Sequence, residues 1–223
     1  MKEPNRDRKG EIKAINAIQL NDEQKEAKRL IVENQIVVIT GQAGSGKSLV
    51  CAQAALDFYQ KKQIERIYNT RAAIEVGKSL GFLPGGLEDK FNPYMEAFLE
   101  NLNKCCKEKG KVDNMIEDGH IIAMPVQFIR GKTVDDVLIV EEAQNLTKGE
   151  MLAILTRLGK TGKIIINGDN NQTDIKTAAG DMNGLSYVLE MAKVVKEIKV
   201  IKLKENHRSD LVGKILSYEY AKK

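Results

Sequence analysis

Two adjacent glutamates, Glu141 and Glu142, end an apolar run in the stretch VLIVEEAQNLT, which occupies residues 137–147. A buried strand cannot carry two carboxylates without partners, because an unpaired buried charge costs a large free energy. The pair therefore requires a bound cation or a reaction that uses acids. The alternative without a function is a helix N-terminus, where the helix dipole stabilises acidic side chains.

The segment GQAGSGKS, residues 41–48, matches the pattern G-x-x-x-x-G-K-[ST] and lies between an apolar strand pattern and a helical pattern. That context favours a phosphate-binding loop, or P-loop, over a glycine-rich turn that matches by chance. The glycines allow backbone N–H groups to point at phosphate oxygens at the N-terminus of the helix. The predicted nucleotide-binding residues are Gly41, Gln42, Ala43, Gly44, Ser45, Gly46, Lys47, Ser48 and Leu49.

The P-loop suggests a role for each charged side chain. Lys47 is expected to reach the β- and γ-phosphates of ATP, and the Ser48 hydroxyl is expected to bind Mg²⁺. In P-loop hydrolases a neighbouring strand ends in an acid that also holds the metal. We therefore predict that Glu141 binds Mg²⁺ and that Glu142 orients and deprotonates the attacking water.

Two further polar segments follow predicted strands. Gln172 lies in IIINGDNNQTDI, where it could contact the γ-phosphate and the attacking water; a Gly-Asp-Asn-Asn turn without function is the alternative. Arg208 lies in LKENHRSD, just past the last predicted strand. It could neutralise charge that develops on the γ-phosphate, or it could cap or pair with a surface helix.

The elements that position these residues alternate between short β-branched runs and helical patterns, which is typical of parallel βα units. Continuous apolar runs suit strands that are buried on both faces of a sheet. Helices are expected over 48–62, after Pro93, and from Thr147, which forms a capping box with Glu150. The expected strands are 36–40, 65–70, 137–141, 163–167 and 198–203, with a shorter one at 119–124.

The chain has 223 residues, enough for one α/β domain with a sizeable core or at most two small ones, and its composition of 42% hydrophobic and 30% charged residues is that of a globular protein. Its three cysteines and two histidines favour neither a disulfide framework nor a zinc site. No signal region or membrane-length run is present, so we expect a cytoplasmic protein without membrane contact. The net charge is +4, and the basic residues after 192 could form either a phosphate-contacting face or a solvated one.

Taken together and in this order, the motifs resemble those of the PhoH family of P-loop ATPases, which is similar to the first motor domain of superfamily 1 helicases. Upstream, LNDEQKEA is similar to the adenine-reading Q motif of those helicases, with Gln24 as the reader. LKENHRS is similar to their arginine-bearing motif, which supports a role for Arg208. The matching blocks are TGQAGSGKS, TRAAIEVGKSLGFLPGGLEDKFNPY, IRGKT, VLIVEEAQNLT, LTRLG and INGDNNQTDI.

The resemblance implies a RecA-like sheet of strand order 5-1-4-3-2 in one domain. Residues 1–34 would form an N-terminal segment with the Q-like motif, and residues 35–223 would form the core. It also implies Mg²⁺-dependent ATP hydrolysis, binding of RNA or single-stranded DNA, and a homo-oligomeric ring, commonly a hexamer. In such a ring we expect Arg208 to reach the nucleotide of a neighbouring subunit.

Two positions depart from the family's usual pattern: Glu141 replaces an aspartate, and Ala72 replaces a proline. Two other functions stay open at this point. One is a P-loop kinase for a small molecule, and the other is a nucleotide-gated binding ring with very slow turnover. The residues expected to contact a nucleic-acid backbone, unless they are merely solvated, are Thr70, Arg71, Arg130 and Lys132.

Overall fold

The computed structural model describes residues 18–72, 87–175 and 181–220, without the side chains of 87–94, 210, 216–217 and 219–220. Its centre is a sheet of six strands in the order β3-β2-β4-β5-β1-β6, with every neighbouring pair parallel. The strands are β1 (Ile36–Gly41), β2 (Ile67–Arg71), β3 (Ile121–Ala123), β4 (Val137–Glu141), β5 (Lys163–Gly168) and β6 (Ile198–Leu203).

This topology confirms the expected RecA-like sheet. Five of the strands have the predicted order 5-1-4-3-2 when they are counted along the chain, and β3 is added at the edge beside β2. The short strand expected at 119–124 is this additional strand. Because β5 lies between β1 and β4, the loops that follow these three strands emerge side by side at the carboxyl edge of the sheet.

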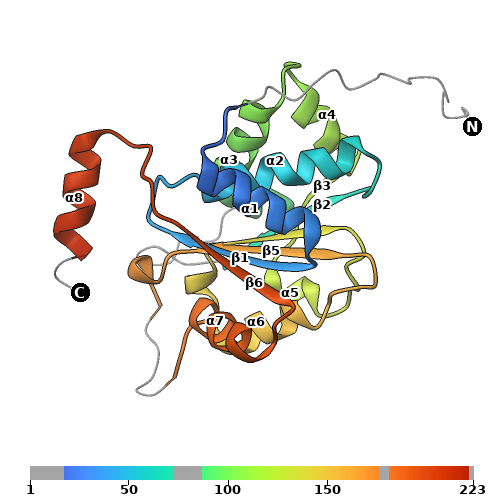
Figure 1. Ribbon diagram of the computed structural model, residues 1–223. Helices are drawn as coiled ribbons and strands as arrows, with labels where there is room; N and C mark the ends of the chain where they lie inside the picture. Colours follow the sequence, from blue (N-terminus) through green and yellow to red (C-terminus); the bar gives the residue numbers. More distant parts are fainter. Residues whose placement is uncertain (1–17, 73–86, 176–180, 221–223) are drawn as a thin grey trace, which may run out of the picture.

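Helices cover both faces of the sheet and form a three-layer α/β/α architecture (Figure 1). One core joins the sheet to α1 (Asp22–Glu33), α2 (Lys47–Gln60), α3 (Leu87–Cys105) and α4 (Lys111–Glu117). The other joins it to α5 (Val126–Ile129), η1 (Ala143–Asn145), α6 (Lys148–Leu155) and α7 (Gly184–Val194). The helix α8 (Asp210–Tyr220) projects away from both layers, and η2 (Asn170–Gln172) follows β5.

The central strands β1, β4 and β5 carry long apolar runs because side chains on both faces are buried. Val37 and Ile39 of β1 point into the core beneath α2, whereas Val38 between them points into the core beneath α6. Alternating burial on both sides therefore produces the continuous apolar runs that are visible in the sequence.

Local capping signals set two of the helix ends. Asn21 and Gln24 form a capping box at the N-terminus of α1, and Thr147 and Glu150 form the predicted one at α6. The helix expected after Pro93 instead begins at Leu87 and continues through the proline. The predicted start was therefore too late in the chain.

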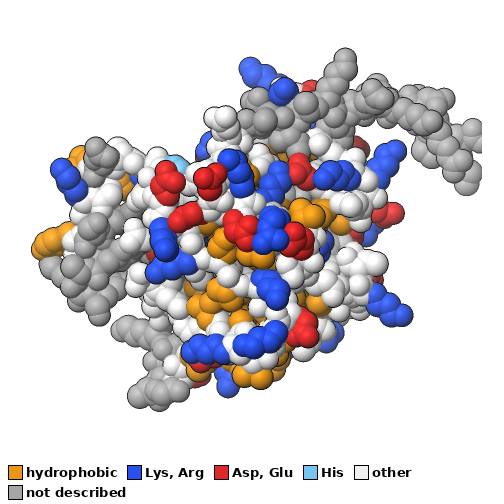
Figure 2. All heavy atoms as spheres, viewed as in Figure 1, with side chains coloured by type: hydrophobic (Ala, Val, Ile, Leu, Met, Phe, Trp, Pro, Cys, Tyr) orange, Lys and Arg blue, Asp and Glu red, His pale blue; other side chains and the backbone are white. Residues whose placement is uncertain are grey.

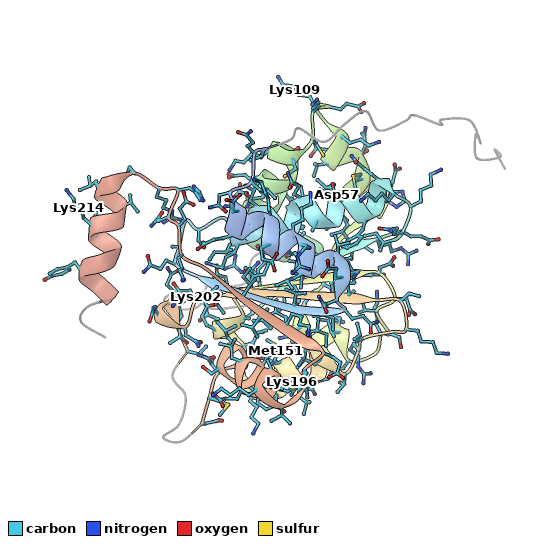
Figure 3. All side chains as sticks on the ribbon, in the orientation of Figure 1. Asp57, Lys109, Met151, Lys196, Lys202 and Lys214 are labelled. Atoms are coloured by element: carbon cyan, nitrogen blue, oxygen red, sulfur yellow. The ribbon has the colours of Figure 1, made fainter. Side chains whose placement is uncertain are left out.

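Basic residues near the carboxyl terminus come from separate elements of the structure. Lys196, Lys202 and Lys214 lie well apart, before β6, within β6 and on α8 (Figure 3). On the face seen in Figure 2, lysine and arginine side chains are interspersed with aspartate and glutamate. This distribution favours a solvated surface over a continuous phosphate-contacting face.

No helix in the described ranges combines the length and apolar character needed to cross a bilayer.

Candidate nucleotide-binding site

The P-loop joins the end of β1 to the N-terminus of α2, and its shape depends on glycine. Gly44 and Gly46 have φ angles of +86° and +84°, a region that residues with a Cβ atom rarely adopt. Both also lie directly beneath other side chains. A Cβ atom at Gly44 would come within 2.6 Å of Arg208 Cγ, and one at Gly46 would overlap Gln24 Nε2. Close packing from above adds a second reason for glycine at each position.

Lys47, the first residue of α2, lies back over the P-loop. Its Nζ donates to the carbonyl oxygens of Gly41 at 2.6 Å and Gln42 at 3.1 Å. Burial lowers the pKa of Lys47, and the carboxylates of Asp169 and Glu142 act in the opposite direction. Lys47 is therefore close enough to the ends of β4 and β5 to feel their charges, as a phosphate-binding lysine requires.

Glu141, the last residue of β4, fits the role of a metal ligand. Its side chain is 4% exposed and makes no hydrogen bond or ion pair with any residue in the part of the chain that the structure describes. A buried carboxylate of this kind is costly unless a cation compensates it. Mg²⁺ prefers oxygen ligands and typically takes one or two carboxylates plus phosphate oxygens. Glu141 and the Ser48 hydroxyl, at the N-terminus of α2, would hold it.

This ligand set is consistent with the side chains nearby. Within the described residues, no group of three or more histidine, cysteine, aspartate or glutamate side chains could hold a metal ion unaided.

Glu142 directs its side chain elsewhere because the backbone turns sharply after Glu141. Its φ of +50° places a non-glycine residue in the left-handed region, at a cost of about 1–2 kcal/mol. Non-glycine residues held in such conformations cluster at functional sites. The turn separates the two carboxylates, so that Glu141 stays buried at the strand end while Glu142 faces the loop after β5.

That loop contains Gln172, and Gln144 connects it to Glu142. Gln144 Nε2 donates to Glu142 Oε2 at 2.5 Å, and Gln144 Oε1 accepts from the backbone N–H of Asp169 at 3.0 Å. Gln144 Nε2 also lies 3.4 Å from the carbonyl oxygen of Gln172. The buried Gln144 amide thus contacts both the carboxylate of the predicted base and the backbone of the loop that carries the predicted γ-phosphate sensor.

Gln24 lies against the P-loop, where it is 4% exposed. Its Nε2 donates to Ser45 O at 3.1 Å, and its Oε1 accepts from Asn21 N at 3.1 Å. The segment after β6 closes over the same place, because His207 N donates to Gly44 O at 3.0 Å. Arg208 therefore lies against Gly44 in the P-loop of its own chain.

The residues expected at a nucleic-acid backbone differ in their exposure. Thr70 is fully buried, and its hydroxyl has no hydrogen-bond partner among the described residues. Arg71 ends β2 as the register partner of Glu141. Arg130 and Lys132 are exposed after α5, and the Lys132 ammonium lies 5.4 Å from the centre of the Tyr68 ring.

Sequence reasoning missed three polar residues of the site: Asn21, Gln144 and His207. The capping-box spacing to Gln24 was a signal for Asn21, whereas Gln144 and His207 are connected to their partners only by the fold. The long block at 70–94 lies largely outside the described residues, as do residues 1–17 of the N-terminal segment.

A P-loop after the first strand, acids at the end of β4 and a polar loop after the intervening β5 define a P-loop NTPase. The profile described as "PhoH: PhoH-like protein" matches residues 16–219, so the chain belongs to the PhoH-like family.

Curated relatives agree with this assignment. A "PhoH-like protein" of Bacillus subtilis (strain 168) is 36% identical over 196 residues, which cover 86% of this chain and 60% of that one. "Protein PhoH" of Escherichia coli (strain K12) is 34% identical over 181 residues, 76% of this chain and 48% of that one. The chain thus spans between about half and three fifths of these relatives.

Two solved structures share this fold. The Pif1 helicase of Candida albicans has a TM-score of 0.50 at 15% identity, covering 90% of this chain and 43% of that one. The large terminase of a thermophilic bacteriophage has a TM-score of 0.54 at 9% identity, and the match covers 88% of this chain and 49% of the terminase chain. At these identities the likeness shows a shared fold.

Proposed function

We propose that this chain hydrolyses ATP in the presence of Mg²⁺ and couples the reaction to RNA or single-stranded DNA. One observation carries the proposal: Lys47 of the P-loop lies within electrostatic reach of Glu142 and Asp169, while Glu141 is buried beside them without a partner among the described residues. A cation-binding acid, a second acid and a phosphate-binding lysine thus converge at one edge of the sheet.

Each side chain has a distinct task in this reaction. The P-loop N–H groups and Lys47 bind the β- and γ-phosphates, and Glu142 takes the proton of the attacking water. Gln172 contacts the γ-phosphate, and Arg208 neutralises the charge that develops on it. Ser48 and Glu141 hold Mg²⁺, which when bound supplies positive charge to the β- and γ-phosphate oxygens.

The position of Arg208 changes one expectation. Its Cγ approaches Gly44 of the same chain, so the arginine can serve the nucleotide of its own subunit without crossing a ring interface. A homo-oligomeric, hexameric ring in the cytoplasm remains part of the proposal, as does nucleic-acid contact through Arg71, Arg130 and Lys132. Thr70 would need a local opening to join them, because it is buried.

The experiment is phosphate release from Mg·ATP, titrated with single-stranded RNA or DNA homopolymers and repeated over a range of protein concentrations. Hydrolysis stimulated by either polymer supports the proposal. Turnover that requires an added small-molecule acceptor would identify a kinase instead. Nucleotide binding without phosphate release would identify a binding ring. The position of Glu142, which suits activation of water, argues against the kinase.

A further inference from the structure

Gln144 occupies a position between the two loops that carry the chemistry. It belongs to η1, directly after Glu142, and its side chain is completely buried. Its NH₂ group contacts the Glu142 carboxylate and the Gln172 carbonyl oxygen, and its carbonyl oxygen contacts the backbone N–H of Asp169. We call this set of contacts the Gln144 bridge.

The orientation of the Gln144 amide follows from its partners. The backbone N–H of Asp169 can only donate, so the atom that faces it must be the carbonyl oxygen, Oε1. The NH₂ group then faces two acceptors, the Glu142 carboxylate and the Gln172 carbonyl oxygen. A flipped amide would place the NH₂ group against the Asp169 N–H and the amide oxygen against the Glu142 and Gln172 oxygens. Only the present orientation therefore allows all of these hydrogen bonds.

The loop after β5 approaches Gln144 very closely. A Cβ atom at Gly168 would lie 2.6 Å from Gln144 Oε1 and 3.2 Å from the backbone nitrogen of Ala143. Thr173 Oγ1 also donates to the carbonyl oxygen of Gln144 at 3.1 Å. The two loops are therefore fitted together around this residue, and a shift of one loop is transmitted to the amide.

The bridge restrains one oxygen of Glu142 and leaves the other available. Oε2 accepts from Gln144, whereas Oε1 makes no hydrogen bond to any described residue. Since Glu142 has a strained backbone, its carboxylate needs this second point of attachment for a defined direction.

We propose that Gln144 is a positioning residue that couples the γ-phosphate-sensing loop after β5 to the Glu142 carboxylate. When the loop is seated, the amide aims Glu142 at the attacking water; when the loop shifts, the base loses its direction. This inference rests on the proposed ATP hydrolysis and adds the element that connects sensing to catalysis.

The main test variant is Gln144→Glu, which has nearly the same size and keeps an acceptor for the Asp169 N–H but loses the donor to Glu142. We expect kcat to fall about 10²-fold, since misplacement of a catalytic group by about 1 Å costs that much. KM and the affinity for Mg·ATP should change by less than about threefold, because the P-loop contacts are untouched. The variant Gly168→Ala, which displaces the amide by crowding, should have the same effect.

Asn145 provides a matched control. It is also a buried amide of η1 and joins the same two loops. Its Oδ1 accepts from Asp174 N at 2.8 Å and its Nδ2 donates to Asp174 Oδ2 at 3.1 Å, but its side chain makes no hydrogen bond to Glu142. Asn145→Leu should lower thermal stability, but it should lower kcat much less than Gln144→Glu, because Gln144 still holds both the loop and Glu142. In a Glu142→Gln background, Gln144→Glu should have no further effect on the remaining rate, because the base it positions is absent.

Three outcomes would overturn the inference: an unchanged kcat in Gln144→Glu, an equal loss in Asn145→Leu, or a full additional loss in the Glu142→Gln background. Thermal unfolding and Mg·ATP affinity, measured on every variant, separate misfolding from loss of positioning. An inactive wild-type chain would refute the proposed function together with the bridge. An active wild type with any of the three outcomes would refute the bridge alone.

Discussion

The two halves of the nucleotide site are held together differently. On the P-loop half, the Lys47 ammonium donates to carbonyl oxygens of the loop itself, contacts that it would release in order to bind phosphate as proposed. On the hydrolytic half, Glu142 and the loop after β5 are already joined through the buried Gln144. With ATP bound as proposed, Lys47 would exchange its carbonyl contacts for phosphate contacts. The side chains around Glu142 are already connected before ATP binds.

This difference separates affinity from rate. Groups that are preorganised around the reacting atoms act mainly in the transition state, so their loss lowers kcat. Groups that exchange one set of hydrogen bonds for another on binding act mainly on affinity. Substitutions in the two halves should therefore produce distinct kinetic signatures.

The largest effect on rate is expected from Glu142→Gln, which keeps the size of the side chain and removes the base. General bases contribute about 10²- to 10⁴-fold in rate, so turnover should fall by that factor while ATP affinity is retained. Single-turnover phosphate release and an equilibrium titration with a fluorescent ATP analogue measure the two quantities. Hydrolysis within a few-fold of wild type would remove Glu142 from this role.

On the P-loop half, Lys47→Met should weaken ATP binding. Hydrogen bonds to charged groups contribute about 1.5–3 kcal/mol, which corresponds to roughly 10- to 100-fold in Kd. The melting temperature without nucleotide should change little, because losing two hydrogen bonds is offset by relief of ammonium burial. Lys25→Met is the control, since that ammonium pairs with Asp22 on the surface. Equal ATP affinity in the Lys47 and Lys25 variants would contradict the P-loop assignment.

Glu141 lies at the junction of the two halves and should have a smaller effect. Glutamate reaches about one methylene further than aspartate, and Mg²⁺ demands near-ideal octahedral geometry. Glu141→Asp should therefore raise the Mg²⁺-dependent rate several-fold, and Mn²⁺ should support relatively better hydrolysis by the wild type. Glu141→Gln should weaken the dependence on metal concentration. A slower Glu141→Asp enzyme would show that the site is shaped around glutamate.

The smallest effect on rate is expected from Lys163, which is remote from both halves. Its Nζ donates to the carbonyl oxygens of Ile31, Val32 and Asn34 and so completes the C-terminus of α1. Lys163→Met should destabilise the fold by about 2 kcal/mol. That corresponds to a fall of roughly 4–8 °C in melting temperature. The kcat should stay unchanged; a drop matching that of Glu142→Gln would mean that stability alone controls turnover.

Several elements could be predicted because their signals are contiguous in the chain. Gly41–Ser48 carries its own turn chemistry and helix start, and Thr147 with Glu150 caps α6 through contacts three residues apart. Local hydrogen bonds and steric limits act in the same way whatever surrounds them. The helix around Pro93 was placed less well, because a proline that usually marks a helix start lies inside α3.

The contacts of the site depend on residues far apart in sequence. Gln144 meets Asp169 across 25 residues, and Gln24 meets His207 across 183. No periodicity or spacing encodes such pairs, because each requires the strand order to bring two loops to the same edge of the sheet. Arg208 likewise lies beside the P-loop of its own chain because the segment after β6 returns over Gly44.

The sequence by itself determined the P-loop, the paired acids and the parallel α/β class, because short-range geometry and burial leave their pattern in consecutive residues. Only the tertiary structure decided that Glu141 is buried without a partner among the described residues, that Glu142 turns away from it, and that Gln144 lies between base and sensor. These properties arise from packing between distant segments, where the strand order and the close approach at Gly168 select which groups can meet.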